Sequence, residues 1–482
     1  MKKKVRVCSL VRNFVSGLFF IFALSGCVNL NPGNTEDITS SVVVGNAGSV
    51  PKNLPGNSKN SGGEKKSEAV DYVTFQRTRT LRYRSEASNS LAAQNGPYVI
   101  FVSIDGFRYD YLDLFRPENL IKMGSDGVRA QSLQPIYPSK TFPNHYTLVT
   151  GLSPEKHGIV SNDFYDPVRK NRYSLRDRQA VEDGTWYGGE PLWVAAEKKG
   201  YLSSSFFWVG SEANIQNAHP NTYFRFEPNI PESYRTDQAL DWLSLPPEKR
   251  PHLIMLYFEN VDSAAHKFGV RSQQTQHAIQ VVDAEIGRLR HALKSLNLPV
   301  NLIVVSDHGM ADLDNEKTIF LDSDPQVEAL LQSFQIYGHG PHMQLYLKED
   351  QPPAAIKELK KALLKSAQHL RVYEIQELKK FRYKNNKRVG DLVIEPDLPY
   401  VVELKSNFKK ASGATHGWDP TKYKSMHGIF IAEGPAFKKN FKTPTFENIH
   451  VYPLILDILG VPIPPGIDGR LSVTSAVRSK QK

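Results

Sequence analysis

The stretch YVIFVSID, residues 98–105, decides the fold together with NLIVVSDHG, residues 301–309. Both are continuous apolar runs rich in β-branched residues, and both lead directly into an aspartate. Such runs are typical of strands that are buried on both faces in a mainly parallel sheet. Similar apolar runs recur along the chain, at residues 203–210, 252–260, 343–348 and 428–435.

Helical patterns lie between these runs, at residues 188–200, 273–296 and 354–370. In the second of them, apolar residues recur at three- and four-residue steps, as on the face of a helix that packs on a sheet: Ile279, Val282, Ile286, Leu289 and Leu293. The alternation of strands and helices predicts an α/β, doubly wound fold with a mainly parallel central sheet flanked by helices. Ligands of such folds bind beyond the carboxyl ends of the strands.

The net charge of +10 over 482 residues invites a search for a basic surface. Residues 1–26 hold five basic residues and no acidic one, and residues 27–96 hold eight basic and six acidic ones. This leaves 47 basic against 44 acidic residues from residue 97 onward. The body of the protein is therefore nearly neutral, and the sequence shows no nucleic-acid-binding surface.

The N-terminus has the pattern of a secretory signal: a basic head, an apolar stretch over residues 14–24 and a small-residue exit. The apolar stretch is too short for a membrane span, which needs about 20 residues. Leu24-Ser25-Gly26-Cys27 resembles the lipobox of bacterial lipoproteins, in which the cysteine is lipidated. An ordinary signal peptide is the alternative; we favour the lipoprotein, because Cys27 falls where cleavage is expected.

This pattern predicts an exported protein that is anchored to a membrane. Residue 29 is Asn and not an acidic residue, which, by resemblance to the lipoproteins of Gram-negative bacteria, favours the outer membrane or the periplasmic face of such a bacterium. Cys8 and Cys27 are the two cysteines of the chain, so the mature protein has no pair that can form a disulfide.

Residues 27–96 are expected to form a flexible tether between the signal at 1–26 and a catalytic domain at 97–475. Residues 28–70 are rich in Asn, Gly, Ser, Pro and Lys, a composition that is poor in residues for a core. Residues 71–96 alternate Arg with Thr, Tyr and Leu, which is compatible with an edge strand or with a solvated face. We favour the solvated face.

Carboxylates and imidazoles follow several of the predicted strands. Asp105 ends the first, Asp307 and His308 follow another, and Asp262 and His266 stand four residues apart, on one side of a helical turn. His416 lies in the sequence ATHGWDP. Oxygen and nitrogen ligands without a thiolate suit Zn²⁺, with Mn²⁺ or Fe as alternatives. Each residue alone is also explained as a helix cap or a structural histidine, so their joint placement carries the prediction.

Thr141 stands just before Pro143, and proline favours the first turn of a helix. A hydroxyl at a helix N-terminus lies where backbone N–H groups favour phosphate oxygens. Beside a metal ion it becomes a nucleophile. Without the neighbouring ligands, Thr141 would be read as a simple N-cap.

Residues 97–470 resemble the nucleotide pyrophosphatase/phosphodiesterases of the alkaline phosphatase superfamily. The resemblance rests on motifs in the family's order: SIDGFRYDYL, KTFPNHYTLVTGLSPEKHGIVSN, FENVDSAAHKFG, VVSDHGM, THGWDP, FIAEGPAF and IDGR. It implies two zinc ions in an alkaline phosphatase-like fold. The first would be bound by Asp262, His266 and His416, and the second by Asp105, Asp307, His308 and Thr141.

The resemblance also implies a mechanism. The Thr141 alkoxide would attack phosphorus in line, and water would then hydrolyse a phospho-threonine intermediate. Asn162 and the backbone N–H of Phe142 would contact the phosphoryl oxygens. His427 competes with His416 as a ligand; we prefer His416, because it stands in the family's pattern. His339 and His342 are expected to be structural or surface residues.

The implied substrates are nucleotide phosphodiesters and pyrophosphates, with nucleoside 5′-monophosphates as products. Phe142 would stack on one face of the base and Phe226, or its neighbour Tyr223, on the other, unless these rings are core residues. Val209 replaces a proline that many members carry, which leaves this pocket less defined. Phospholipid head-group or choline-type esters are the alternative substrates, and an inactive surface binding lipoprotein is the alternative class. Monoesterase activity and the oligomeric state stay open.

Overall fold

The computed structural model describes residues 81–83, 86–228, 230–410 and 412–479. The predicted signal at 1–26, Cys27 and the tether as far as residue 80 lie outside the described residues. Within the described part, none of the helices combines the length and the apolar character that crossing a membrane requires.

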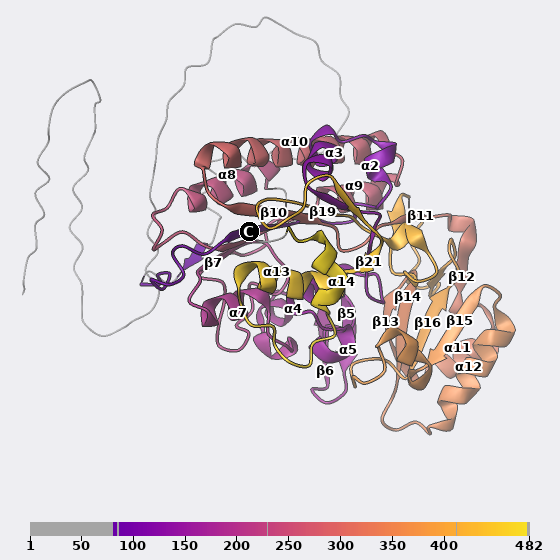
Figure 1. Ribbon diagram of the computed structural model, residues 1–482. Helices are drawn as coiled ribbons and strands as arrows, with labels where there is room; N and C mark the ends of the chain where they lie inside the picture. Colours follow the sequence, from indigo (N-terminus) through magenta and orange to yellow (C-terminus); the bar gives the residue numbers. More distant parts are fainter. Residues whose placement is uncertain (1–80, 84–85, 229, 411, 480–482) are drawn as a thin grey trace, which may run out of the picture. The chain divides into compact units, whose positions relative to one another are not determined.

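The central sheet has nine strands among the described residues, and it is mainly parallel as predicted (Figure 1). Strands β1 and β19 run antiparallel to the other seven. The order of the nine strands across the sheet is β1 (Leu81–Tyr83), β8 (Thr222–Phe224), β7 (Ser203–Phe206), β9 (Leu253–Phe258), β2 (Tyr98–Ile104), β10 (Val300–Val305), β19 (Phe430–Glu433), β3 (Val128–Ala130) and β20 (Phe441–Thr443).

Helices cover both faces of this sheet. Every residue of β2, β9 and β10 is buried, which is the reason that their sequences are almost entirely apolar. Alternate residues of β2 belong to two different hydrophobic clusters, because successive side chains point to opposite faces. The first cluster includes α4 (Thr141–Thr150), α7 (Leu192–Lys198) and α13 (Val451–Leu459), and the second includes α3 (Glu118–Asp126), α8 (Glu232–Leu243), α9 (Asn260–Phe268) and α10 (Gln273–Leu296).

Helix α10 confirms the predicted apolar stripe. Ile279, Val282, Ile286 and Leu289 are buried in the second cluster, and Leu293 packs against it. The remaining short elements are α2 (Tyr111–Leu114), β4 (Leu133–Gln134), α5 (Pro154–His157), β5 (Asp163–Asp166), β6 (Asn171–Ser174), α6 (Arg178–Glu182), β11 (Ala311–Asp312), β12 (Thr318–Phe320), β17 (Val401–Glu403), β18 (Ala414–Thr415), β21 (Phe446–Glu447) and α14 (Leu471–Thr474).

A second, antiparallel sheet corrects one of the strand predictions. The run at 343–348 does not join the central sheet, because β14 (His342–Leu347) pairs with β13 (Phe334–His339) as a hairpin closed by two residues. A two-residue turn joins antiparallel neighbours, so the pairing is local. Strands β16 (Leu392–Pro396) and β15 (Leu370–Glu374) complete this sheet, and α11 (Pro325–Leu331) and α12 (Ala354–Ser366) pack on it in a separate cluster.

The chain is already packed on the central sheet before residue 97. Strand β1 pairs with β8 at the sheet's edge, so the edge strand is observed there and the preferred solvated face is wrong. Asn89 is buried, and its Nδ2 donates to the carbonyl oxygens of Pro247 and Arg250 at 2.7 and 2.6 Å. The packed body therefore begins earlier than the boundary that we expected.

Candidate active site

The six predicted ligands gather at the carboxyl ends of the central strands. Asp105 directly follows β2, and Asp307 and His308 follow β10 by two and three residues. Helix α9, which follows β9, carries Asp262 and His266, and His416 directly follows β18. Residues more than 300 positions apart in the chain therefore meet at one edge of the sheet, as expected for a doubly wound fold.

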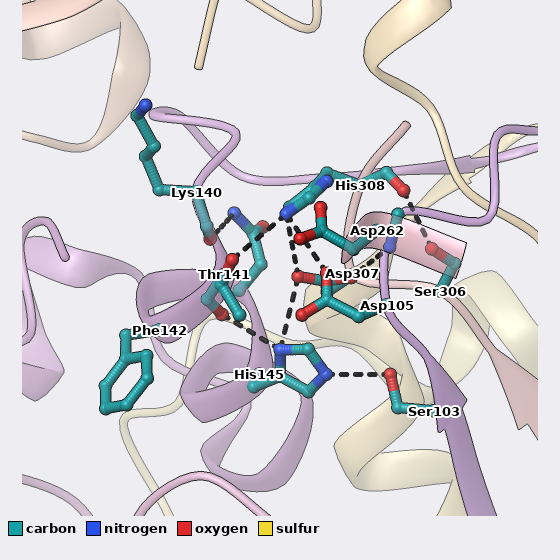
Figure 2. A network of polar contacts seen from close by, with 12 residues as sticks. Ser103, Asp105, Lys140, Thr141, Phe142, His145, Asp262, Ser306, Asp307 and His308 are labelled. Carbon is teal, nitrogen blue, oxygen red and sulfur yellow. Dashed lines mark hydrogen bonds and ion pairs between the residues drawn. The ribbon is translucent and has the colours of Figure 1, made fainter. Parts of the chain in front are cut away.

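His308 lies at the centre of this cluster. Its Nε2 is 3.1 Å from Asp307 Oδ2 and 3.4 Å from Asp105 Oδ1. Its ring stacks on that of His416 with 3.5 Å between centroids. Figure 2 shows the carboxylates of Asp105, Asp262 and Asp307 facing the His308 ring.

Two overlapping groups of side chains have the spacing of a metal site. The donor atoms of Asp105, Asp307 and His308 lie within 4.8 Å of one another, and so do those of Asp262, His308 and His416. His266 stands beside the second group: its Nε2 is 3.5 Å from Asp262 Oδ2, and its ring centroid is 5.1 Å from that of His416. His308 is thus placed within reach of both groups, whereas the resemblance assigns it to one ion.

Burial makes the carboxylates energetically costly without a cation. Asp105 and Asp307 are 1% and 0% exposed. Burial raises the pKa of both well above the usual range, and the neighbouring charges of Asp307 and Asp262 raise that of Asp105 further. Three of the cluster's buried oxygens have no hydrogen-bond partner: Asp105 Oδ1, Asp262 Oδ1 and Asp307 Oδ2. Oxygens of this kind fit divalent cations, which satisfy and neutralise them.

The three histidines present lone pairs to the same place. Each Nδ1 lies near a backbone carbonyl: His308 near Gly309 at 3.0 Å, His266 near Ala414 at 2.8 Å and His416 near Ser139 at 2.7 Å. A carbonyl only accepts, so Nδ1 carries the proton and Nε2 keeps its lone pair. Burial also lowers the pKa of His308 and His416 well below the usual value, which favours neutral imidazoles. This donor set suits zinc.

Thr141 is the first residue of α4, and its Oγ1 lies 3.2 Å from His308 Nε2. The hydroxyl therefore combines a helix N-terminus with the edge of the carboxylate cluster. Asn162 lies at the same helix end, where its Oδ1 accepts a hydrogen bond of 2.9 Å from the Phe142 N–H. The Phe142 N–H that we expected to meet a phosphoryl oxygen is therefore directed at Asn162 in this structure.

The other predicted histidines lie apart from the cluster. His427 has Ser132 Oγ at 2.9 Å from Nδ1 and the Pro420 carbonyl at 2.8 Å from Nε2. His342 is buried beside Tyr137, and His339 is exposed, with Nδ1 3.3 Å from a carboxylate oxygen of Glu403.

Two of the predicted stacking rings, Phe142 and Phe226, pack against different hydrophobic clusters. Phe142 packs against the first cluster, with its centroid 6.2 Å from Tyr173. Phe226 packs against the second, with centroids 5.2 Å from Phe207 and 6.2 Å from Tyr257. Tyr223 lies in β8 and stacks on His219 at 4.9 Å.

Two polar residues support the ligands without having been predicted. Tyr257 donates a hydrogen bond of 2.6 Å to Asp105 Oδ2. Ser139 Oγ donates to the Trp418 carbonyl at 2.7 Å and accepts from the Gly417 N–H at 3.1 Å, which holds the loop after His416. Tyr257 lies inside an apolar strand and gives no signal in the sequence, whereas Ser139 stands two residues before Thr141.

Residues 99–419, which include all six predicted ligands, match a family model described as type I phosphodiesterase/nucleotide pyrophosphatase. The chain is 33% identical over 415 residues to venom phosphodiesterase 2 of Crotalus adamanteus, covering 82% of this chain and 50% of that protein. It is 34% identical over 390 residues to ectonucleotide pyrophosphatase/phosphodiesterase family member 1 of Homo sapiens, covering 78% and 41%. The chain thus spans about half or less of the length of these relatives.

A solved structure supports the same relationship. Murine ectonucleotide pyrophosphatase/phosphodiesterase 5, in an inactive form in complex with AMP, is similar with a TM-score of 0.73 at 30% identity. The match covers 80% of this chain and 100% of that one. The expectation of an alkaline phosphatase-like fold, drawn from the sequence motifs, is confirmed.

Substitution of Asp307 by Asn should stabilise the protein in a chelator and destabilise it in zinc. Because burial raises the folded-state pKa of Asp307, its ionised form penalises the metal-free fold at pH 8, and the penalty vanishes as the pH falls through that pKa. We expect the metal-free variant to unfold roughly 1–3 °C above wild type at pH 8, with the difference shrinking toward pH 5.

In excess zinc the order should reverse. A ligand at a thousandfold excess over its Kd stabilises the folded protein by about 4 kcal/mol. The variant loses part of this stabilisation, because it lacks one of the carboxylates that would bind zinc. Differential scanning calorimetry with and without zinc measures both effects. A metal-free variant that unfolds several degrees below metal-free wild type at pH 8 would contradict this account of the carboxylates.

Proposed function

The chain belongs to the type I phosphodiesterase/nucleotide pyrophosphatase family, and from this premise we propose that it is a zinc-dependent hydrolase of nucleotide phosphodiester or pyrophosphate bonds. Its products would be nucleoside 5′-monophosphates. The observation that carries the proposal is the position of Thr141: a hydroxyl at a helix N-terminus, 3.2 Å from His308 Nε2 at the edge of buried, unpartnered carboxylate oxygens.

Two zinc ions fit the residues present. Asp262, His266 and His416 would hold one, and Asp105, Asp307, His308 and Thr141 the other. Bound there, zinc would polarise the Thr141 hydroxyl and the phosphoryl oxygens. Tyr257 would keep Asp105 oriented through its 2.6 Å hydrogen bond, and the Nδ1 contacts would keep each imidazole turned toward its ion.

Thr141 acts as the nucleophile in this proposal. Its oxygen attacks phosphorus in line, the Oγ1 proton is released, and the bond to the leaving oxygen breaks as the phospho-threonine forms. Water then attacks the same phosphorus from the opposite side and restores the hydroxyl. The positive end of the α4 helix dipole stabilises the negative charge that builds on the phosphoryl oxygens. Asn162 lies at the same helix end, where its amide N–H₂ can donate to one of these oxygens while Oδ1 accepts from Phe142.

The alternative substrates keep the same chemistry. A phospholipid head-group or choline-type ester would need no base stacking, whereas a nucleotide would use Phe142 and Phe226. An inactive binding protein is disfavoured by the presence of Thr141, Asn162 and all six ligands in one cluster.

Thr141→Ala should reduce turnover at least a thousandfold, because no other hydroxyl replaces the nucleophile. Zinc content and thermal stability in zinc should stay near wild type, since three protein ligands of that ion remain. The measurement is hydrolysis of a dinucleotide polyphosphate, with zinc quantified by atomic absorption on the same samples. Thr141→Ser, which keeps a hydroxyl, is the matched control and should retain measurable turnover.

The substrate panel adds nucleotide sugars, choline esters and phosphate monoesters. Turnover of choline esters without turnover of dinucleotides would contradict the nucleotide assignment. Undiminished turnover in Thr141→Ala would contradict the nucleophile.

Phe226→Ala should raise KM for nucleotides about 10- to 100-fold, because stacking on a base is worth about 1–3 kcal/mol. Tyr223→Ala, three residues earlier in the chain and stacked on His219, tests the other candidate ring and should change KM less than threefold. Steady-state kinetics with a dinucleotide and with a substrate that lacks a base distinguish stacking on the base from a role of Phe226 in the core. An equal loss on both substrates would assign Phe226 to the core instead.

We also propose that the chain is exported and anchored through lipidated Cys27. The support is the basic head, short apolar stretch and lipobox-like residues 24–27. Cys27→Ser expressed in a Gram-negative host should move the protein from the membrane fraction to the soluble fraction. A wild-type protein that is soluble and carries no lipid in its intact mass would overturn the anchor.

A further inference from the structure

His145 is a buried imidazole on α4 that the proposed mechanism does not use. It stands one helical turn after Thr141 and is 0% exposed. Its Nδ1 lies 3.0 Å from the Thr141 carbonyl oxygen, and its Nε2 lies 2.8 Å from Ser103 Oγ. Figure 2 shows the ring between the nucleophile's helix and Ser103 on β2.

The partners of the ring define its protonation. The Thr141 carbonyl only accepts, so Nδ1 carries the proton and donates it there. Nε2 is then an acceptor, and the Ser103 hydroxyl donates to it. Burial lowers the pKa of His145, in agreement with a neutral ring. Every polar atom of the imidazole is thereby satisfied at a fixed orientation.

This arrangement joins two parts of the catalytic cluster. Ser103 stands on β2 two residues before Asp105, and Thr141 begins α4. His145 Nδ1 is also 3.2 Å from Asp307 Oδ2, although its hydrogen bond is directed at Thr141 and that oxygen has no hydrogen-bond partner. The ring therefore touches the backbone of the nucleophile and a ligand of the same predicted ion.

The ring is also held from its sides. Its centroid lies 5.5 Å from Trp208 and 5.1 Å from Tyr257, both edge to face. Tyr257 in turn donates to Asp105. An apolar residue would be enough for packing against these rings. The hydrogen bonds of Nδ1 to Thr141 and of Nε2 to Ser103 both need an imidazole.

We propose that His145 is a positioning residue, which through the link Ser103–His145–Thr141 sets the nucleophile in register with Asp105 and Asp307. The proposal rests on the proposed function, in which Thr141 is the nucleophile and Asp105 and Asp307 are metal ligands. It assigns His145 no contact with substrate. Residues that orient metal ligands in this way typically contribute 10- to 100-fold in metal affinity or activity.

Two substitutions of similar size separate positioning from packing. Asparagine places its amide nitrogen near the position of Nδ1 and can still donate to the Thr141 carbonyl. Glutamine places its amide near Nε2 and keeps a partner for Ser103 but loses that donor. His145→Gln should lower kcat about 10- to 100-fold with KM changed less than threefold. His145→Asn should recover kcat to within about fivefold of wild type.

Zinc affinity provides a readout that does not depend on turnover. Titration of the metal-free full chain against a chromophoric chelator should show one of two ions weakened about tenfold in His145→Gln and nearly unchanged in His145→Asn. Ser103→Ala, a smaller change that should fold, should lower kcat about three- to tenfold. His252→Gln is the matched control: it is a fully buried histidine near the amino ends of the same strands, beside the Pro97 carbonyl, and should leave kcat unchanged.

The outcomes distinguish this proposal from the function on which it rests. Equal kcat and zinc affinity in His145→Gln and His145→Asn would overturn the positioning role, and so would a Ser103→Ala variant identical to wild type. If wild type binds two zinc ions and hydrolyses none of the substrates, the proposed function fails while the zinc titration still decides on His145.

Discussion

The burial of like charges at one edge of the sheet is the constraint on which the rest of the site depends. Asp105 and Asp307 follow neighbouring strands that are buried along their whole length, and Asp262 faces them from α9. Such strands form because helices cover both faces, and the same burial removes water from the carboxylates that follow them. Oxygens left without partners there favour cations, so the packing that makes the sheet also makes a candidate metal site.

The surrounding chain holds the ligands from several directions. Ser139 ties the loop after His416 to the segment that precedes Thr141. From the antiparallel sheet, the buried Glu395 accepts hydrogen bonds from the Asp419 N–H at 3.1 Å and from Arg371 at 2.8 Å. The second sheet, which contributes none of the six predicted ligands, thus fixes the far end of the loop that carries His416. Ligand geometry is therefore a property of contacts between distant segments.

Sequence patterns predicted those parts of the molecule that depend on local composition. The apolar runs at 98–105 and 301–309 indicate strands that are buried on both faces, and the apolar stripe on α10 indicates a helix that is buried on one face. The motifs placed the predicted ligands at strand ends. The run at 343–348 has the same apolar character, yet it pairs locally through its hairpin. The hydrogen bond between Asn162 and Phe142 arises between residues 20 positions apart, and neither periodicity nor composition encodes such a contact.

Anomalous scattering at the zinc edge from crystals of the zinc-loaded protein tests the central claim most directly. The account predicts two peaks. Nε2 of His266, Nε2 of His416 and Asp262 should bind one ion, and Asp105, Asp307, His308 and Thr141 Oγ1 should bind the other. A single peak at which His308 joins Asp262 and His416, or a cluster that binds no zinc, would contradict it.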